Sequence, residues 1–306
     1  MSKPHPGRFV LIAVALLAVA LVALATACGG SGNQKTAGGQ VKVVTSIALF
    51  ADLIQNVGGD RVQVTALVPP GADPHTYEPA PPQAAKVAQA DLVVINGLNL
   101  EETLHDLIQN NVGGSVPVVE MAGGLPVIGA GSGTAGNPHL WLNVQNAMHY
   151  VESIRDGLIQ VDPAGADVYR ANAAAYLQEL HALDKETATA IATIPPERRK
   201  LVTFHDAYPY LAQRYGLELV GVAEESPGQE PSAGDLAALT DKIRSQNVPI
   251  LFAEPEFNAA VLQAAASEAG VKVKTLLSDA YADNVHSYVE LIRFDAQQLV
   301  EGLGSP

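Results

Sequence analysis

Residues 162–196 read DPAGADVYRANAAAYLQELHALDKETATAIATIPP. Asp162-Pro163 is typical of a helix start, and Pro195-Pro196 is typical of a helix end. The residues between them, 163–194, would span about 48 Å as a helix. Mostly apolar positions recur at spacings of three and four, which predicts one buried stripe. These positions are Tyr169, Ala173, Tyr176, Leu180, Leu183, Thr187, Ile191 and Ile194. We therefore expect a long, rigid helix that crosses two lobes and packs against both.

Short β-rich runs alternate with helical stretches on both sides of this helix. Strands separated by single helices predict a parallel sheet with crossover helices. The last predicted helix, 284–303, closes the second series. The predicted fold class is α/β: two parallel-sheet lobes, 41–162 and 195–306, joined by the linking helix 163–194.

The first 27 residues form a separate segment. Lys3 and Arg8 precede a run without charge, 9–27, which is typical of an export signal. Cys28 follows at once, with small residues before it, so we expect a lipoprotein signal peptide at 1–27 and acylation of Cys28. Residues 28–40 are rich in glycine and predict a flexible tether. The alternative is an uncleaved membrane anchor, because 19 apolar residues can just span a bilayer.

Composition excludes several classes of protein. The chain has 306 residues, a formal net charge of −14 and one cysteine. The acidic balance argues against a nucleic-acid partner, which requires a basic surface. One cysteine excludes an intrachain disulfide, a four-cysteine zinc site and an iron–sulfur cluster. A metal site in this chain must therefore use His, Asp or Glu.

Four candidate metal ligands follow predicted strands. His75 and His139 lie in the first lobe, and His205 and Asp279 lie in the second. Ligand clefts in open α/β sheets lie at the carboxyl ends of the strands, so these side chains can meet between the lobes. Three nitrogens and one oxygen complete a tetrahedral Zn²⁺ site. For any one of these histidines, the alternative is an ordinary solvated or hydrogen-bonded loop residue.

Two acidic residues are candidates for a supporting role. Glu78, three positions after His75, is expected to orient that ring or to start a turn. Asp206 adjoins His205 and is expected to stabilise a turn or support the site. The remaining histidines of the mature chain are expected to be ordinary residues of predicted helices; they are His105, His149, His181 and His286. The glycine-rich stretch 122–137 is expected to be a surface loop.

The sequence resembles the cluster A-I (cluster 9) zinc and manganese solute-binding lipoproteins of ABC importers. The matching segments are PPGADPHTYEP (69–79), ADLVVINGLNLE (90–101), NPHLWLN (137–143) and LLSDAY (276–281). The similarity covers nearly all of 41–306. It implies two α/β lobes joined by one rigid helix, with the metal site in the cleft between them.

The resemblance places the four metal ligands on His75, His139, His205 and Asp279. A histidine at the third position goes with zinc in this family, and a glutamate goes with manganese in many members. His205 thus favours zinc, as imidazole suits Zn²⁺ better than Mn²⁺. Two features depart from many zinc-binding members: stretch 122–137 has no His or acid, and no disulfide can form.

We therefore expect a binding protein, not an enzyme. It would capture Zn²⁺ outside the cytoplasm and deliver it to a membrane permease driven by a separate ATPase. We expect a monomer held by its lipid anchor on the outer face of the cytoplasmic membrane, or in a periplasm. Manganese is the alternative cargo. A secreted zinc hydrolase is a remote alternative, because no His-Glu-x-x-His pair is present. An adhesin role is a further alternative, but no sequence feature encodes it.

Overall fold

The computed structural model describes residues 39–131, 135–224, 228–229 and 231–304. The expected signal peptide 1–27, Cys28 and the tether up to residue 38 lie outside these residues. Within the described part of the chain, no helix is both long enough and apolar enough to cross a membrane.

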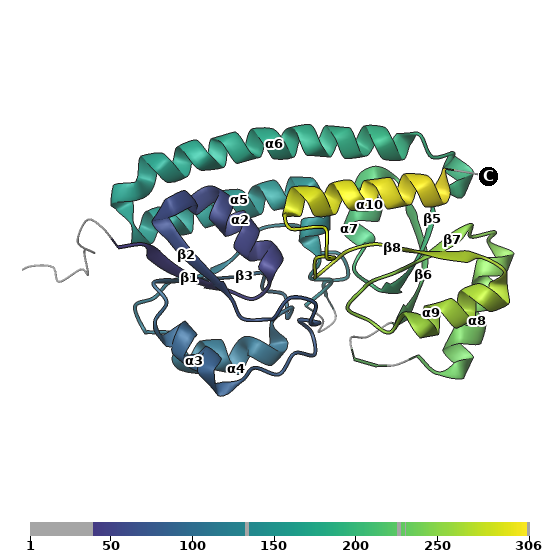
Figure 1. Ribbon diagram of the computed structural model, residues 1–306, viewed down its shortest axis with the longest axis horizontal. Coiled ribbons are helices and arrows are strands. Elements are labelled where there is room, and N and C mark those ends of the chain that lie inside the picture. The colour runs from purple at the N-terminus through teal and green to yellow at the C-terminus, as the bar shows by residue number, and fades with distance from the viewer. Residues whose placement is uncertain (1–38, 132–134, 225–227, 230, 305–306) are drawn as a thin grey trace, which may run out of the picture. The chain divides into compact units, whose positions relative to one another are not determined.

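The first lobe is built on a parallel sheet with strand order β2-β1-β3-β4. Its strands are β1 (Val41–Thr45), β2 (Val62–Ala66), β3 (Leu92–Ile95) and β4 (Val118–Glu120). Its helices are α2 (Ala48–Gly58), α3 (Pro81–Ala88), α4 (Glu102–Asn111) and α5 (Val144–Val161). Helices α2 and α5 lie on one side of the sheet, and α3 and α4 lie on the other (Figure 1).

The second lobe repeats this arrangement with strand order β6-β5-β7-β8. Its strands are β5 (Lys200–His205), β6 (Glu218–Glu224), β7 (Ile250–Ala253) and β8 (Lys272–Thr275). Its helices are α7 (Pro209–Tyr215), α8 (Ala233–Ser245), α9 (Ala259–Ala269) and α10 (Tyr288–Leu303). All strand pairs in both sheets are parallel. The predicted α/β fold class is confirmed.

Helix α6 (Ala166–Ala192) joins the lobes and packs against helices of both. It runs alongside α5 and α2 of the first lobe and α10 of the second (Figure 1). The predicted stripe is buried along its whole length, from Tyr169 to Ile191, and Ile194 beyond the helix is buried too. Each fully buried large apolar side chain contributes about 1.5–3 kcal/mol, so this seam holds α6 firmly on both lobes.

The apolar core continues from one lobe into the other. One hydrophobic cluster joins the first lobe and α6 to one face of the second sheet, where Leu201 belongs to it. The next residue, Val202, faces the opposite side of the sheet and packs beneath α8 and α9, as the two-residue period of a strand requires. The junction between the lobes is therefore part of the core.

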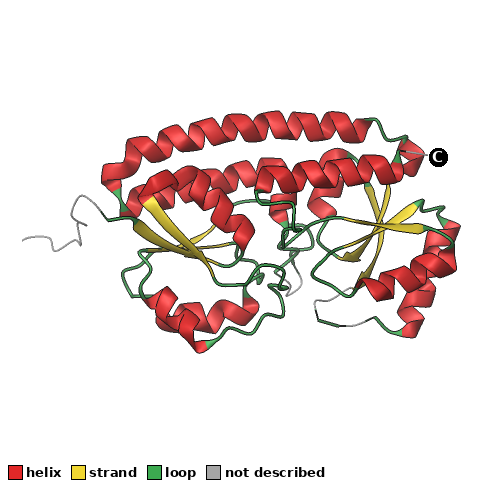
Figure 2. Cartoon of the chain, in the orientation of Figure 1, coloured by secondary structure: helices red, strands yellow, loops and turns green. Residues whose placement is uncertain are grey.

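Hydrogen bonds also cross this junction close to the loops. The Trp141 indole Nε1 donates to the Ser278 carbonyl oxygen at 3.1 Å, and the Tyr288 hydroxyl donates to the Trp141 carbonyl oxygen at 2.7 Å. Both aromatic side chains are fully buried. Loops from the two lobes meet between the two sets of strands (Figure 2). Helix α6 is therefore one of several connections between the lobes.

Some local predictions were wrong. The helical segment begins at Pro163 as predicted, but its first turn is the 3-10 turn η3 (Pro163–Gly165), and the α-helix itself begins at Ala166. The Asp162 side chain does not cap the helix; its carboxylate accepts hydrogen bonds from Arg61 and Tyr169. The last helix begins at Tyr288, so His286 precedes it. Ser287 caps this helix by accepting a hydrogen bond from the Glu290 N–H.

Candidate metal site

The four predicted ligand residues lie at the carboxyl ends of the two sheets, in loops or at a strand end. His75 is in the loop after β2, and His139 is in the loop after β4, directly before the 3-10 turn η2 (Leu140–Leu142). His205 is the last residue of β5, and Asp279 follows β8. Parallel strands direct all four residues to the same side, so the repeated topology brings the two halves of the site face to face.

The ligand atoms of these four residues all lie within 4.8 Å of one another. The Nε2 atom of His139 is 3.2 Å from the Nε2 atoms of both His75 and His205. The Asp279 carboxylate oxygens are 3.4–3.7 Å from the three imidazole Nε2 atoms. A tetrahedron with its centre about 2.05 Å from each corner has edges of about 3.3 Å. Five of the six separations between the ligand residues, at 3.2–3.7 Å, are close to this value.

Asp279 brings a buried negative charge to the cluster. Its side chain is fully buried, and neither carboxylate oxygen has a hydrogen-bond partner among the described residues. Burial alone would raise the pKa of Asp279, but the imidazoles of His139, His205 and His75 outweigh it and hold the pKa below its ordinary value. A buried carboxylate without hydrogen bonds is costly unless a cation faces it. This arrangement therefore suits a metal ion.

The two histidines of the first lobe are set up as neutral ligands. Burial lowers the pKa of His75 to about 4, although Asp279 opposes the shift. Burial also lowers the pKa of His139. Both rings are therefore unprotonated at neutral pH, and the lone pairs on their nitrogens can bind a metal without first losing a proton.

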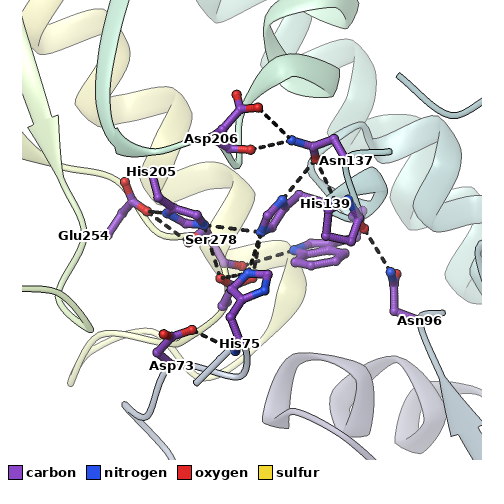
Figure 3. A network of polar contacts seen from close by, with 12 residues as sticks. Asp73, His75, Asn96, Asn137, His139, His205, Asp206, Glu254 and Ser278 are labelled. Carbon is purple, nitrogen blue, oxygen red and sulfur yellow. Dashed lines mark hydrogen bonds and ion pairs between the residues drawn. The ribbon is translucent and has the colours of Figure 1, made fainter. Parts of the chain in front are cut away.

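His205 differs because it contacts a second buried carboxylate. Its Nδ1 lies against the carboxylate of Glu254, which is 1% exposed (Figure 3). Burial would lower the pKa of His205, but Glu254 and Asp279 outweigh it and raise the pKa well above its ordinary value. A carboxylate on the far nitrogen fixes the ring with Nε2 toward the metal and strengthens it as a donor.

Sequence reasoning missed Glu254. Thr203 of β5 pairs with Phe252 of β7, so the residues two places further on, His205 and Glu254, meet at the end of adjacent strands. Ser278 lies between two acids, donating to Glu254 at 3.4 Å and to Glu256 at 3.0 Å. Burial raises the pKa of Glu256 to about 8, so this second acid is protonated at neutral pH. The only signal for Glu254 in the sequence was an acidic residue at the end of the strand that lies beside the strand of His205.

The structure separates the two proposed supporting acids. Asp206 accepts a hydrogen bond from Asn137, whose own Oδ1 lies 3.0 Å from His139 Nδ1 (Figure 3). Glu78 is exposed, and no hydrogen bond or ion pair joins it to another described residue. The acid beside His75 is instead Asp73, which accepts a hydrogen bond from the His75 backbone N–H at 2.9 Å.

The other histidines lie away from the cluster. His105 is exposed and contacts Asp106, and His149 lies 2.9 Å from the Gly123 carbonyl oxygen. His181 and His286 are exposed. Among the described residues, only the four predicted ligands form a group of three or more His, Cys, Asp or Glu side chains that could hold a metal ion.

A pocket of about 660 Å³ leads to the cluster. His75, His139 and His205 line it, while Asp279 does not and is closed off behind the rings. The described part of the glycine-rich loop borders this pocket through Ile128, Gly129 and 135–137. This loop was expected to be an ordinary surface loop, but it forms part of the pocket wall.

Two parallel α/β lobes, a long helix packed on both and a buried cluster of three histidines and one aspartate define a metal-binding protein of the solute-binding class. Comparison with known proteins agrees. A family profile described as "Zinc-uptake complex component A periplasmic" matches residues 43–302. The chain therefore belongs to this family, the cluster A-I metal-binding solute-binding lipoproteins of ABC transporters. The members of this family are solute-binding proteins that work outside the cytoplasm. The expectation of a binding protein, and not an enzyme, is confirmed.

Individual relatives differ in the metal that their names give. The manganese-binding lipoprotein MntA of Halalkalibacterium halodurans is 33% identical over 303 residues, covering 96% of this chain and 97% of that protein. The periplasmic zinc-binding protein TroA from Treponema pallidum has a TM-score of 0.81 at 28% identity, covering 87% of this chain and all of that one. A manganese-bound periplasmic protein from Candidatus Liberibacter asiaticus has a TM-score of 0.78 at 29% identity, covering 86% and 100%.

Proposed function

We propose that this protein captures Zn²⁺ through His75, His139, His205 and Asp279 and delivers it to a membrane permease driven by a separate ATPase. The observation that carries the proposal is the convergence of four ligand atoms within 4.8 Å of one another, around a buried carboxylate without hydrogen bonds. All three histidines present Nε2 to a common point, and one carboxylate opposes them.

The donor set favours zinc. Imidazole nitrogen suits Zn²⁺, whereas Mn²⁺ prefers a larger share of oxygen ligands. Four donors at tetrahedral separations leave no position for a bound water, which is typical of a closed binding site and not of a catalytic zinc. The carboxylate of Glu254 behind His205 completes a carboxylate–histidine–metal arrangement that is common at zinc sites.

Manganese is the second candidate. It is supported by the names of relatives, among them the manganese-binding lipoprotein MntA and the manganese ABC transporter substrate-binding lipoprotein PsaA of Streptococcus pneumoniae, which is 31% identical over 305 residues. For Mn²⁺ as the cargo, the Asp279 carboxylate is the one oxygen ligand group that the cluster offers to a metal that favours oxygen.

Metal analysis tests this choice. Protein purified without added metal is analysed for its elements, then titrated with Zn²⁺ and Mn²⁺ in competition with a chelating dye. We expect zinc to bind more tightly, and His205→Ala to weaken zinc binding by at least about tenfold. Tighter binding of manganese would assign that cargo instead, and unchanged affinity in His205→Ala would remove His205 from the ligand set.

Attachment to the membrane is a separate part of the proposal. Cys28 follows an apolar segment and small residues, as expected for an acylated N-terminal cysteine. Metabolic labelling with a fatty-acid analogue should mark the wild-type protein and leave Cys28→Ser unmarked. Labelling of the Cys28→Ser variant would contradict acylation at this residue.

A further inference from the structure

Asn137 lies two residues before His139 in the first lobe, but its side chain reaches the second lobe. Its Oδ1 accepts a hydrogen bond from the His139 backbone N–H at 3.0 Å and lies 3.0 Å from the ring Nδ1. Its Nδ2 donates to the Asp206 carbonyl oxygen and, at 3.2 Å, to the Asp206 carboxylate. One amide thus touches a candidate ligand on one side and the opposite lobe on the other (Figure 3).

The partners of this amide fix its orientation. Asp206 offers two oxygen acceptors, a backbone carbonyl and a carboxylate, so the NH₂ group of Asn137 must face it. The Asn137 oxygen then faces His139, and a hydrogen bond between them requires a proton on Nδ1. This tautomer leaves the lone pair on Nε2, the atom that lies 3.2 Å from the Nε2 atoms of His75 and His205.

The backbone around Asn137 is held from both lobes. The Tyr210 hydroxyl of α7 donates to the Asn137 carbonyl oxygen at 2.8 Å and accepts from the Ile128 N–H. Asn96 of the first lobe donates to the Pro138 carbonyl oxygen at 2.9 Å. Gly136 has a φ of 86°, and a Cβ there would lie 2.9 Å from the Ala130 nitrogen, so this approach requires glycine.

We propose that Asn137 is a positioning residue for metal capture: it holds the Nδ1 proton of His139 and links that ring to Asp206 of the second lobe. The state of the contact between the lobes is thereby transmitted to a metal ligand. The inference rests on the proposed role of His139 as a ligand, and it adds a connection that neither the fold nor the ligand set requires.

Four variants separate the two sides of the amide. Asn137→Ala removes both, and we expect the zinc Kd to rise about 10–100-fold. Asn137→Asp keeps an acceptor for His139 but sets a carboxylate against the oxygens of Asp206, so Kd should rise about tenfold. Asp206→Asn should have little effect alone, because Asn137 still finds acceptors there. Combined with Asn137→Asp, the Asp206→Asn substitution supplies a hydrogen-bond donor to the new carboxylate. We expect the zinc Kd of this double variant to be at least about threefold lower than that of Asn137→Asp alone.

Asn146→Ala is the matched control. The Asn146 side chain donates to the Leu140 carbonyl oxygen at 3.0 Å, so it supports the same turn without touching His139 or the second lobe. We expect its zinc Kd to stay within about twofold of wild type. An Asn137→Ala effect no larger than that of Asn146→Ala, or the absence of recovery in Asn137→Asp/Asp206→Asn, would overturn the proposal.

A measurement on the unmutated protein gives an independent readout. Nitrogen NMR of histidine-labelled, metal-free protein should show the proton of neutral His139 on Nδ1, and Asn137→Ala should shift the population toward Nε2. A proton mainly on Nε2 in wild type would overturn the inference. His139→Ala distinguishes the ligand role of His139 from the positioning role of Asn137. If His139→Ala binds zinc like wild type, the ligand assignment fails. If His139→Ala loses zinc binding but Asn137→Ala binds normally, only the positioning role is rejected.

Discussion

The two lobes share one strand order but equip the metal site in different ways. The first lobe supplies two rings whose pKa values are lowered by burial, and the ring of His139 contacts the neutral amide of Asn137. The second lobe supplies the carboxylate of Asp279 and a ring whose pKa is raised by the neighbouring carboxylates of Glu254 and Asp279. The same topology therefore carries neutral donors on one side and charge on the other.

This difference indicates how the site can hold a dication. Three neutral imidazoles and one carboxylate leave a Zn²⁺ complex with a charge near +1, and the buried Glu254 offsets part of the remainder. Because the negative charge is concentrated in the second lobe, removing a carboxylate there should lower affinity more than removing one in the first lobe.

The largest effect is expected from Asp279→Asn, which removes the only charged ligand while keeping the shape of the side chain. We expect zinc affinity to fall about 100-fold in competition titrations, as for loss of one partner of a buried charge pair. Asp295→Asn is the control, since Asp295 is a buried acid outside the ligand group and burial raises its pKa well above the ordinary value. Equal effects of the two substitutions would contradict the assignment of charge to Asp279.

Glu254→Gln is expected to come next. The amide cannot stabilise a proton on His205 Nδ1 as a carboxylate does, so zinc affinity should fall about tenfold or more. The matched control is Glu256→Gln, two residues away, which replaces an acid that is already protonated at neutral pH. We expect the control to bind zinc within about threefold of wild type. The same loss in both variants would show that packing, and not the charge of Glu254, supports the ligand.

The pH dependence of zinc binding should report the protonated ring of the second lobe. Metal-free His205 holds an extra proton because its pKa is raised, and zinc must displace it. Affinity should therefore increase with pH, about tenfold per unit, from above the lowered pKa values of His75 and His139 up to the raised pKa of His205. His105→Ala should leave this slope unchanged. A zinc affinity that is constant between pH 5 and the pKa of His205 would contradict the displacement of a proton from His205 by zinc.

The smallest effect is expected in the first lobe, at Glu78. This residue follows His75 by three positions but is exposed and has no hydrogen bond or ion pair to another described residue. Glu78→Ala should change zinc affinity by less than about threefold in the same competition titration. A tenfold loss would return Glu78 to the supporting role that the sequence suggested.

Much of the fold could be predicted from local sequence. The alternation of strands and helices predicted two parallel sheets. The stripe from Tyr169 to Ile191 predicted a helix that packs against both lobes, and this stripe is buried. The connections across the junction could not be predicted, because the bonds of Trp141 to Ser278 and of Tyr288 to Trp141 join residues more than 130 positions apart. The contact of Arg61 with the Asp162 carboxylate could not be predicted for the same reason, because it spans 101 positions.

The candidate ligands were predictable because they follow strands whose ends converge. Their supporting residues were harder to find, since each partner is distant in the sequence: Glu254 contacts His205 across 49 positions, and Asn137 contacts Asp206 across 69. Proximity in sequence favoured Glu78 over Asp73, although Asp73 is the acid that contacts the His75 backbone. Sequence spacing indicated the metal-binding residues, and the register of β5 on β7 was needed to find Glu254.

The most direct test of the central claim is X-ray absorption spectroscopy at the zinc edge of the zinc-loaded protein. We expect a four-coordinate shell of about three imidazole nitrogens and one oxygen at about 2.0–2.1 Å, with one imidazole fewer in His139→Ala. A shell with one imidazole or none, or a spectrum that is the same in wild type and in His139→Ala, would contradict the claim that these side chains hold the metal.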